Sequence, residues 1–440
     1  MYTNKQIWHV SFPILLSLLA QNIINVTDTA FLGRVSEVAL GASAMGGLFY
    51  ICIFTVAFGF STGSQIVIAR RNGEKKYAEV GPVMIQGAMF LLIMASLLFA
   101  FSRLFGGNIM HLLVSSETIF NATMEYIHWR VFGFFFAFIN VMFRAFYIGT
   151  TRTKVLIINA IVMAITNVIL DYILIFGKFG FPELGIKGAA IASVIAEASS
   201  IVFFLIYTYI TVDLKKYGLN RFRSFNSALL MRILNISSFT MLQYFLSMAT
   251  WFAFFAAVER IGQRELAIAN IVRSIYIVMM VSVSSLSTAA NSLVSNTIGS
   301  GDINHVIPLI KKIARFSFLI MMILVIVVVV FPKAILSIYT NEAALIAESV
   351  PSVYVISGAM LIASVSNILF SGISGTGNTR SALMLETITL TIYMLYVFIV
   401  GVWLHAPVEI CFTTEVLYYS LVLLASYFYF KKAKWQNKKI

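Results

Sequence analysis

A succession of apolar stretches, each about 20–30 residues long and separated by short polar breaks, runs through almost the whole sequence. Each stretch is long enough to cross a lipid bilayer as a helix. Charged residues make up only 11% of the chain, whereas a soluble domain carries about 25%. The pattern predicts an all-α polytopic membrane protein. Its twelve expected transmembrane helices cover residues 8–33, 40–69, 82–104, 118–148, 155–177, 186–211, 228–258, 264–298, 313–331, 345–372, 381–404 and 408–430.

Positive charges are distributed unevenly over the breaks. Counted on alternate breaks and the two chain ends, 21 of the 31 Lys and Arg residues lie on one side, 7 on the other and 3 within the apolar stretches. Lys and Arg gather in cytoplasmic loops, so we expect both termini in the cytoplasm and the protein in the cytoplasmic (inner) membrane. The same bias accounts for the net charge of +13 without a nucleic-acid partner.

The sequence also contains an internal repeat. Glu37-Val-Ala-Leu-Gly-Ala aligns with Glu265-Leu-Ala-Ile-Ala-Asn, and Asn72-Gly-Glu aligns with Ser300-Gly-Asp at the same offset of 228. Each half then has six helices, which predicts two six-helix bundles related by a pseudo-twofold axis along the membrane normal. The expected parts are an N-terminal lobe at 1–211, a cytoplasmic linker at 212–227 and a C-terminal lobe at 228–440.

Two polar residues stand out inside the fifth apolar stretch. Asn167 and Asp171 lie one helical turn apart, and a carboxylate within a membrane costs about 2.5–3.5 kcal/mol or more. At a rise of about 1.5 Å per residue, Asp28, Asp171 and Ser193 all lie about 8–10 Å from the predicted external ends of their helices. Asn25 and Asn167 lie one turn deeper. The sequence thus predicts a polar site at one level of the N-terminal lobe.

Such a site has a natural occupant. Two carboxyls at close range share a proton or bind a cation, because both cannot stay ionised cheaply. Oxygen ligands from Asp28, Asn167, Asp171 and Ser193 suit H⁺ or Na⁺ better than a transition metal. In the competing structural interpretation, Asp28 pairs with Arg34 or caps a helix, and the other polar groups only join neighbouring helices.

Other polar groups within the apolar stretches rank below this set. Glu197 lies on the same face of the sixth helix and is a candidate for extending a proton path. Arg273 lies deep in the eighth helix and either lines a cavity or pairs with an acid. Asn140, which begins a further repeated block in which Asn140-Val-Met-Phe matches Asn367-Ile-Leu-Phe, is a secondary candidate. Glu386 is expected at the cytoplasmic rim near Arg380.

Enzyme motifs are absent from the sequence. It has no Walker A loop, no HExxH and no GxSxG. Cys52 and Cys411 give neither a disulfide framework nor a metal-ligand spacing. We therefore expect no enzyme activity and no cofactor, and an ion gradient as the source of energy.

With these residues placed, the sequence resembles the multidrug and toxic compound extrusion (MATE) family. The matching stretches are NVTDTAFLGR, ALGA, GSQIVIARRNGE, FRAFYIGTTRTK, NVILDYILIFG, GIKGAAIAS and SGTGNTR, which together span essentially the whole chain. The sequence looks most like the DinF-like branch, because its N-terminal lobe carries the acids. This resemblance implies that Asp28, Asn167 and Asp171 form the cation or proton site, with Ser193 where a threonine is common and a backbone carbonyl from Ala189.

The sequence departs from the branch of this family that uses a helix 7 glutamate and a helix 10 aspartate. Those regions read QYFLSMATW and MLIASVSNILF here, without an acid. The departure leaves a C-terminal Na⁺ site without the ligands that the resemblance would supply.

The sequence therefore predicts a secondary active antiporter that exports cationic amphipathic drugs in exchange for H⁺ or Na⁺ by alternating access. We expect it to act as a monomer surrounded by membrane lipid. Two alternatives stay open. One is a lipid-linked oligosaccharide flippase of a related superfold, which would need several cavity cations where only Arg273 is a deep candidate. The other is an intramembrane aspartyl enzyme built on Asp28 and Asp171.

Overall fold

The computed structural model describes residues 2–220, 225–437 and 440, and these are almost entirely helical. Part of the expected linker, with Arg221 and Arg223, and the terminal Lys438 and Lys439 lie outside the described residues. Within the described chain, eleven helices can each span a membrane by length and composition. A twelfth span is formed if α4 (Glu117–Arg130) and α5 (Gly133–Gly149), which meet at a bend of 53°, are counted together. The predicted all-α class is thereby confirmed, with eleven candidate spans, or twelve when the bent pair is counted as one.

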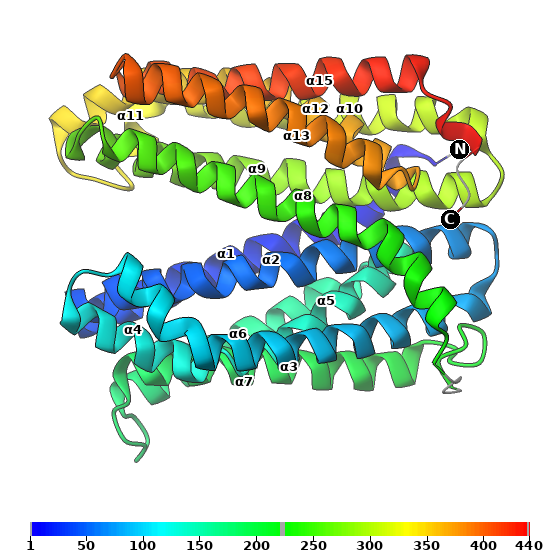
Figure 1. Cartoon of the computed structure of the whole chain (residues 1–440), viewed down its shortest axis with the longest axis horizontal. Coiled ribbons are helices and arrows are strands. Elements are labelled where there is room, and N and C mark those ends of the chain that lie inside the picture. Colours follow the sequence, from blue (N-terminus) through cyan, green and yellow to red (C-terminus); the bar gives the residue numbers. More distant parts are fainter. Residues whose placement is uncertain (1, 221–224, 438–439) are drawn as a thin grey trace. The chain divides into compact units, whose positions relative to one another are not determined.

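The chain divides into two compact units, each formed by long helices lying alongside one another (Figure 1). The N-terminal unit is Phe12–Met241, and the C-terminal unit is Met1–Ser11 together with Leu242–Ile440. As a result, α1 (Asn4–Val35) and α8 (Ser227–Glu259) each contribute to both units. The lobe boundaries and the symmetry axis inferred from the sequence stay predictions.

The helices of the N-terminal unit pack mainly as neighbouring pairs, with α6 along α7 and α2 against both α4 and α5. Ser36 caps α2 by accepting a hydrogen bond from the Ala39 amide at 3.0 Å. Besides α1, α4, α5 and the start of α8, the unit comprises α2 (Glu37–Gly73), the 3-10 helix η1 (Tyr77–Glu79), α3 (Val80–Leu113), α6 (Val155–Phe176) and α7 (Gly185–Thr211).

A close approach between α6 and α7 positions the predicted site. α6 ends at Phe176 and is capped by Gly177, whose left-handed φ of 62° favours glycine. The Leu184 amide then donates to the Leu174 carbonyl at 2.9 Å, which turns the chain back along α6. A Cβ atom at Gly188 would lie only 2.6 Å from that carbonyl oxygen, so glycine permits the contact. The polar residues of the two helices are thereby held face to face.

In the C-terminal unit, α12 packs against α9, α10 and α15 around a core of buried apolar side chains. Besides the end of α8, the unit comprises α9 (Gln263–Gly299), η2 (Ile303–His305), α10 (Val306–Val330), α11 (Pro332–Leu336), α12 (Ala343–Gly375), α13 (Thr379–Val397), the π-helical turn η3 (Phe398–Trp403), α14 (Val408–Cys411), α15 (Thr413–Lys432) and η4 (Trp435–Asn437).

The internal repeat is visible in corresponding elements of the two units. α2 and α9 are both 37 residues long, and each is followed by a three-residue 3-10 helix and then another long helix. α2 packs on α5 in one unit as α9 packs on α12 in the other. The prediction of one continuous helix at 118–148 is wrong, since the chain bends between α4 and α5. In the other unit the corresponding α12 is unbroken.

Candidate functional site

A cavity of about 530 Å³, counting its open mouth, lies within the N-terminal unit. Five helices wall it: α1, α2, α4, α6 and α7. Its polar lining residues are Gln21, Asn25, Asp28, Tyr50, Tyr126, Arg130, Asn167, Ser193 and Glu197. Acids, amides, three hydroxyls and one guanidinium are thus concentrated in one hollow of an otherwise apolar bundle.

Asp28 and Asp171 face each other beside this cavity, with Ser193 next to Asp28. Asp171 is fully buried and Asn167 is 1% exposed. With both acids ionised, one carboxyl oxygen of Asp28, both of Asp171 and both polar side-chain atoms of Asn167 have no hydrogen-bond partner among the described residues, and the two carboxyls can bond to each other only through a shared proton. Buried oxygens in this state are costly unless a proton or cation is bound, so the geometry fits an ion-binding site.

Arg130 supplies the cation of the cavity and is neutralised by Glu197. The two side chains form a bidentate ion pair, with N–O distances of 2.6 Å and 3.0 Å. The Tyr50 hydroxyl donates to the same carboxylate at 3.0 Å, and the guanidinium lies over the Tyr50 ring, 3.5 Å from its centre. The charge of Arg130 also reaches Asp28. Gly133, directly after the bend, leaves room for this group, because a Cβ there would meet all three side chains.

Several residues predicted for the site lie elsewhere. Ala189 is buried in an apolar cluster formed by α1, α2, α4, α6 and α7 and is not among the residues that line the cavity, so its backbone carbonyl as an ion ligand stays a prediction. Asn140 links α5 to α7 by donating to the Glu197 backbone carbonyl at 3.1 Å. Arg273 belongs to the C-terminal unit, where it lies over the rings of Trp251 and Phe255.

The structure also bears on the competing interpretations of single residues. Arg34 is exposed and is not among the groups that act on Asp28, so the alternative Asp28–Arg34 pair does not form. Glu197 lines the cavity as expected, but its carboxylate is committed to Arg130. Within the described residues, no three His, Cys, Asp or Glu side chains form a metal-binding group. A Na⁺ site at Asp28, Asn167, Asp171 and Ser193 stays a prediction.

Sequence reasoning missed the partner of Arg130 and the state of two C-terminal acids. Arg130 and Glu197 were both visible as charges inside predicted spans, and such charges usually pair, which is the signal that could have joined them. The placement of Glu386 at the rim near Arg380 is wrong, because its side chain is 2% exposed and accepts hydrogen bonds from Ser247 and Tyr418.

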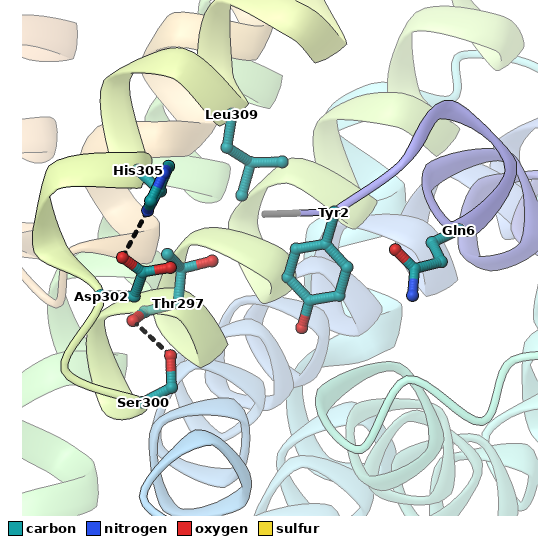
Figure 2. Close-up of a pocket in the computed structure, with 7 residues that line it drawn as sticks. All are labelled: Tyr2, Gln6, Thr297, Ser300, Asp302, His305 and Leu309. Atoms are coloured by element: carbon teal, nitrogen blue, oxygen red, sulfur yellow. Dashed lines mark hydrogen bonds and ion pairs between the residues drawn. The ribbon is translucent and has the colours of Figure 1, made fainter.

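A second hollow, of about 580 Å³ including the open solvent at its mouth, lies in the C-terminal unit (Figure 2). Tyr2, Gln6, Thr297, Ser300, Asp302, His305 and Leu309 line it. Its charged groups are Asp302 and His305, 2.5 Å apart, and both side chains are more than 40% exposed. Because water solvates both groups, these charges are stable without a bound ion.

Membrane-spanning helices in two units, with an unsatisfied acid pair beside a polar cavity, define a polytopic protein of the membrane-transporter class. The chain belongs to the MatE family, whose model matches residues 13–173 and 237–409. The expected MATE resemblance is thereby confirmed, while the assignment to a DinF-like branch stays a prediction. The prediction that the chain is not an enzyme is also confirmed, because the family consists of transporters.

Relatives and solved structures are similar over nearly the whole chain. The probable multidrug resistance protein YoeA of Bacillus subtilis is 23% identical over 97% of this chain and 93% of its own. The probable multidrug resistance protein NorM of Thermotoga maritima is 24% identical, with coverages of 99% and 94%. An outward-facing multidrug resistance MATE family transporter of the MOP superfamily has a TM-score of 0.90 at 15% identity, covering 99% of this chain and 97% of its own. A mutant of the Vibrio cholerae MATE transporter VcmN has a TM-score of 0.87 at 18% identity, with coverages of 99% and 98%. These structures share the fold.

Proposed function

We propose that this chain is a secondary active multidrug antiporter, in which Asp28 and Asp171 couple export of cationic amphipathic compounds to entry of H⁺ or Na⁺. The observation that carries the proposal is the facing acid pair with unsatisfied buried oxygens. Membership of the MatE family supports transport, and the names of the relatives support multidrug substrates. The protein works as a monomer in the cytoplasmic membrane, with both termini in the cytoplasm.

The coupling follows from competition for negative charge. With the ion released, the acid pair carries negative charge that attracts a cationic drug into the polar cavity. A proton or Na⁺ on the pair, with Asn167 and Ser193 as further oxygen ligands, removes that attraction and lets the drug leave. The ion drives the cycle only if it binds the outward-facing and inward-facing states with different affinities.

Arg130 and Glu197 have a different part in this scheme. Because Glu197 neutralises the guanidinium, the Asp28–Asp171 pair is left as the uncompensated charge near the cavity. The arrangement also favours the antiporter over a flippase for phosphate-bearing lipids. Such a flippase needs cations available to phosphate, whereas Arg130 is paired and Arg273 lies over aromatic rings.

Ethidium transport in proteoliposomes tests the proposal. The vesicles hold the full chain and carry an imposed pH gradient, an imposed Na⁺ gradient or neither. We expect one gradient to drive ethidium transport by the wild type, and the active gradient identifies the ion. Asp171→Asn should reduce gradient-driven transport to the level of empty vesicles.

Asp213→Asn is the matched control, because Asp213 lies in the loop after α7 and accepts from the Lys216 amide at 2.9 Å. This variant should transport like the wild type. Full gradient-driven transport by correctly folded Asp171→Asn protein would overturn the proposal.

A further inference from the structure

The C-terminal unit contains a second group of buried acids, on α13 and α15. Glu386 is 2% exposed and Glu415 is 6% exposed. Glu386 and Tyr393 are seven residues apart on α13, so they lie on one face of that helix. Glu415, Tyr418 and Tyr419 are three and four residues apart on α15 and share a face in the same way. These two faces meet, because α13 packs against α15.

Each helix gives the other one acid and one tyrosine. The Tyr418 hydroxyl of α15 donates to the Glu386 carboxyl of α13 at 2.8 Å. In return, the Tyr393 hydroxyl of α13 donates to the Glu415 carboxyl of α15 at 3.0 Å. The rings of Tyr393 and Tyr418 are in edge contact, with centres 5.8 Å apart, so the two acid–tyrosine pairs form one cluster.

Two further helices complete the cluster. Ser247 of α8 donates to the same Glu386 oxygen at 2.8 Å. The hydroxyl oxygens of Tyr276 on α9 and Tyr419 on α15 are 2.6 Å apart. The ring centres of Tyr419 and Tyr418 are 5.0 Å apart. Four helices of one unit therefore converge on two carboxyls through hydroxyl groups.

The Glu386 carboxyl is only half satisfied. Both donors reach its Oε1 atom, while Oε2 is buried without a hydrogen-bond partner among the described residues. Tyr418 from α15 and Ser247 from α8 are the side chains that interact with this carboxyl. α12 and η3 also contact α13, but within the described chain neither contributes a polar or charged partner to Glu386. Arg273, a cation on α9, lies over Trp251 and Phe255 instead. A buried carboxylate without a cation is strongly destabilised, so Oε2 needs a positive partner.

A proton fits this position better than a metal ion. The hydroxyls of Ser247 and Tyr418 direct their hydrogens toward the carboxyl and so do not offer it additional metal-binding oxygens. No cluster of three His, Cys, Asp or Glu side chains occurs in the described chain. Hard cations such as Na⁺ and Ca²⁺ need several oxygen ligands, whereas a proton needs one.

We infer that the C-terminal unit holds a second ion-exchange site, in which Glu386 binds a proton at Oε2 and releases it during the transport cycle. On release the O–H bond breaks, the proton passes to water, and the hydroxyls of Ser247 and Tyr418 stabilise the carboxylate. This inference rests on the proposed antiport in its proton-coupled form. It adds a titrating residue outside the Asp28–Asp171 pair.

Proton release on ethidium binding measures the site directly. Ethidium is added to the purified full chain in weakly buffered detergent, and a pH-sensitive dye counts the protons released. Infrared difference spectra record the loss of the carboxylic acid band in parallel. Glu386→Gln keeps an acceptor for Ser247 and Tyr418 but cannot titrate. It should release about one proton fewer per ethidium and lose part of the acid band.

Two variants separate titration from folding. Glu386→Asp keeps a titratable carboxyl and should restore release, which a merely structural role would not predict. Glu342→Gln removes an exposed acid paired with Arg264 and should release as many protons as the wild type. Should Glu386→Gln fail to fold, the infrared spectrum of the Asp variant decides, because replacing a titrating Glu386 by Asp shifts part of the acid band that is lost, whereas replacing a residue that does not titrate leaves that band unchanged.

The outcomes distinguish this inference from the proposed function. Suppose that the wild type releases protons and that folded Glu386→Gln protein releases the same number and shows the same acid band. This result would overturn the second site alone. A wild type that binds ethidium without releasing protons would overturn both the second site and the proton-coupled form of the proposal.

Discussion

In the N-terminal unit, Asp28 and Asp171 face each other with unsatisfied oxygens beside a cavity that also holds the Arg130–Glu197 ion pair. In the C-terminal unit, Glu386 and Glu415 each accept a hydrogen bond from a tyrosine, and neither forms an ion pair within the described residues. The repeat produced similar helices in both halves, yet the buried charge is handled in two ways.

The difference separates what a fold needs from what a site needs. The long helices correspond between units because each must bury apolar surface and cross the same membrane. The polar groups need not correspond, since a guanidinium, a hydroxyl, a proton or a metal ion can each compensate a buried carboxyl. Sequence changes in one half therefore altered its electrostatics while its architecture persisted.

The largest expected effect comes from making the same substitution in both units. Glu197→Gln leaves Arg130 buried without its counter-ion, and breaking such a pair costs about 3–5 kcal/mol in the free energy of unfolding. Glu386→Gln leaves no cation without a counter-ion and keeps a carbonyl oxygen that accepts from Tyr418. It should therefore lower the free energy of unfolding by about 0.6 kcal/mol, which is typical of one interhelical hydrogen bond in a membrane. Thermal unfolding of the detergent-purified proteins measures both.

A double variant separates the effect of the unpaired Arg130 charge from the effect of altered side-chain packing at the Arg130–Glu197 pair. Arg130→Met together with Glu197→Gln removes the buried cation as well, and should recover most of the lost stability. Equal unfolding temperatures for Glu197→Gln and Glu386→Gln would remove the proposed difference between the units.

Much of the fold could be predicted from the sequence, because apolar length and the repeat of Glu37-Val-Ala-Leu-Gly-Ala are local signals. The bend between α4 and α5 could not, since the apolar pattern runs on through it. The contacts of Arg130 with Glu197 of α7 lie next to the bend, and a helix-by-helix interpretation does not contain such tertiary contacts. Helix ends differ for the same reason, as with α3, predicted at 82–104 and found at Val80–Leu113.

The candidate sites were predictable to different degrees. Asp171 and Asn167 stood out because polar side chains one turn apart in an apolar stretch are rare and costly. The structure places them beside Asp28 and Ser193, as expected from their depths. Among the C-terminal acids, Glu386 was misplaced and Glu415 was not singled out, because their partners are tyrosines. With 19 tyrosines in the chain, no single one could be singled out without knowing which helices touch.

The next largest effect tests close helix packing in the N-terminal unit. Gly59 and Gly63 of α2 lie directly against the α8 backbone, where the Thr240 hydroxyl donates to the Gly59 carbonyl at 2.6 Å. At the repeat offset of 228, the corresponding α9 residues are Ser287 and Asn291, so only α2 has glycines at both positions. Gly63→Ala would force a methyl group into Ser237 and should destabilise the protein by about 1–3 kcal/mol.

Gly358→Ala in α12 of the other unit is the matched control, because a Cβ at this exposed helical position meets nothing within 4 Å. Alanine there should stabilise the helix by up to about 1 kcal/mol. Thermal unfolding again gives the measurement. If both alanine variants shift the midpoint in the same direction, the α2–α8 contact does not depend on glycine.

The smallest effect concerns two loops that the repeat aligns, after α2 and after α9. In the first, Glu74 pairs with Arg71 at 2.7 Å and with Lys76 at 3.1 Å. Burial acts to raise the pKa of Glu74, but the hydrogen bonds from Arg71 and Lys76 outweigh it and hold that pKa below its ordinary value of 4.5. In the second, the aligned Asp302 pairs with His305, which is charged only when its imidazole is protonated.

The pairing of Glu74 should make stability depend on pH. The Glu74 contribution is present above pH 4.5 and is lost as the pH falls through the lower folded-state pKa. Glu74→Gln should thus cost about 0.2–1 kcal/mol at neutral pH and less in acid. Asp302→Asn, which removes the exposed pair of the aligned loop, is the comparison variant. Unfolding midpoints from neutral pH into acid compare the variants, and a cost of Glu74→Gln that stays constant as the pH falls would contradict this prediction.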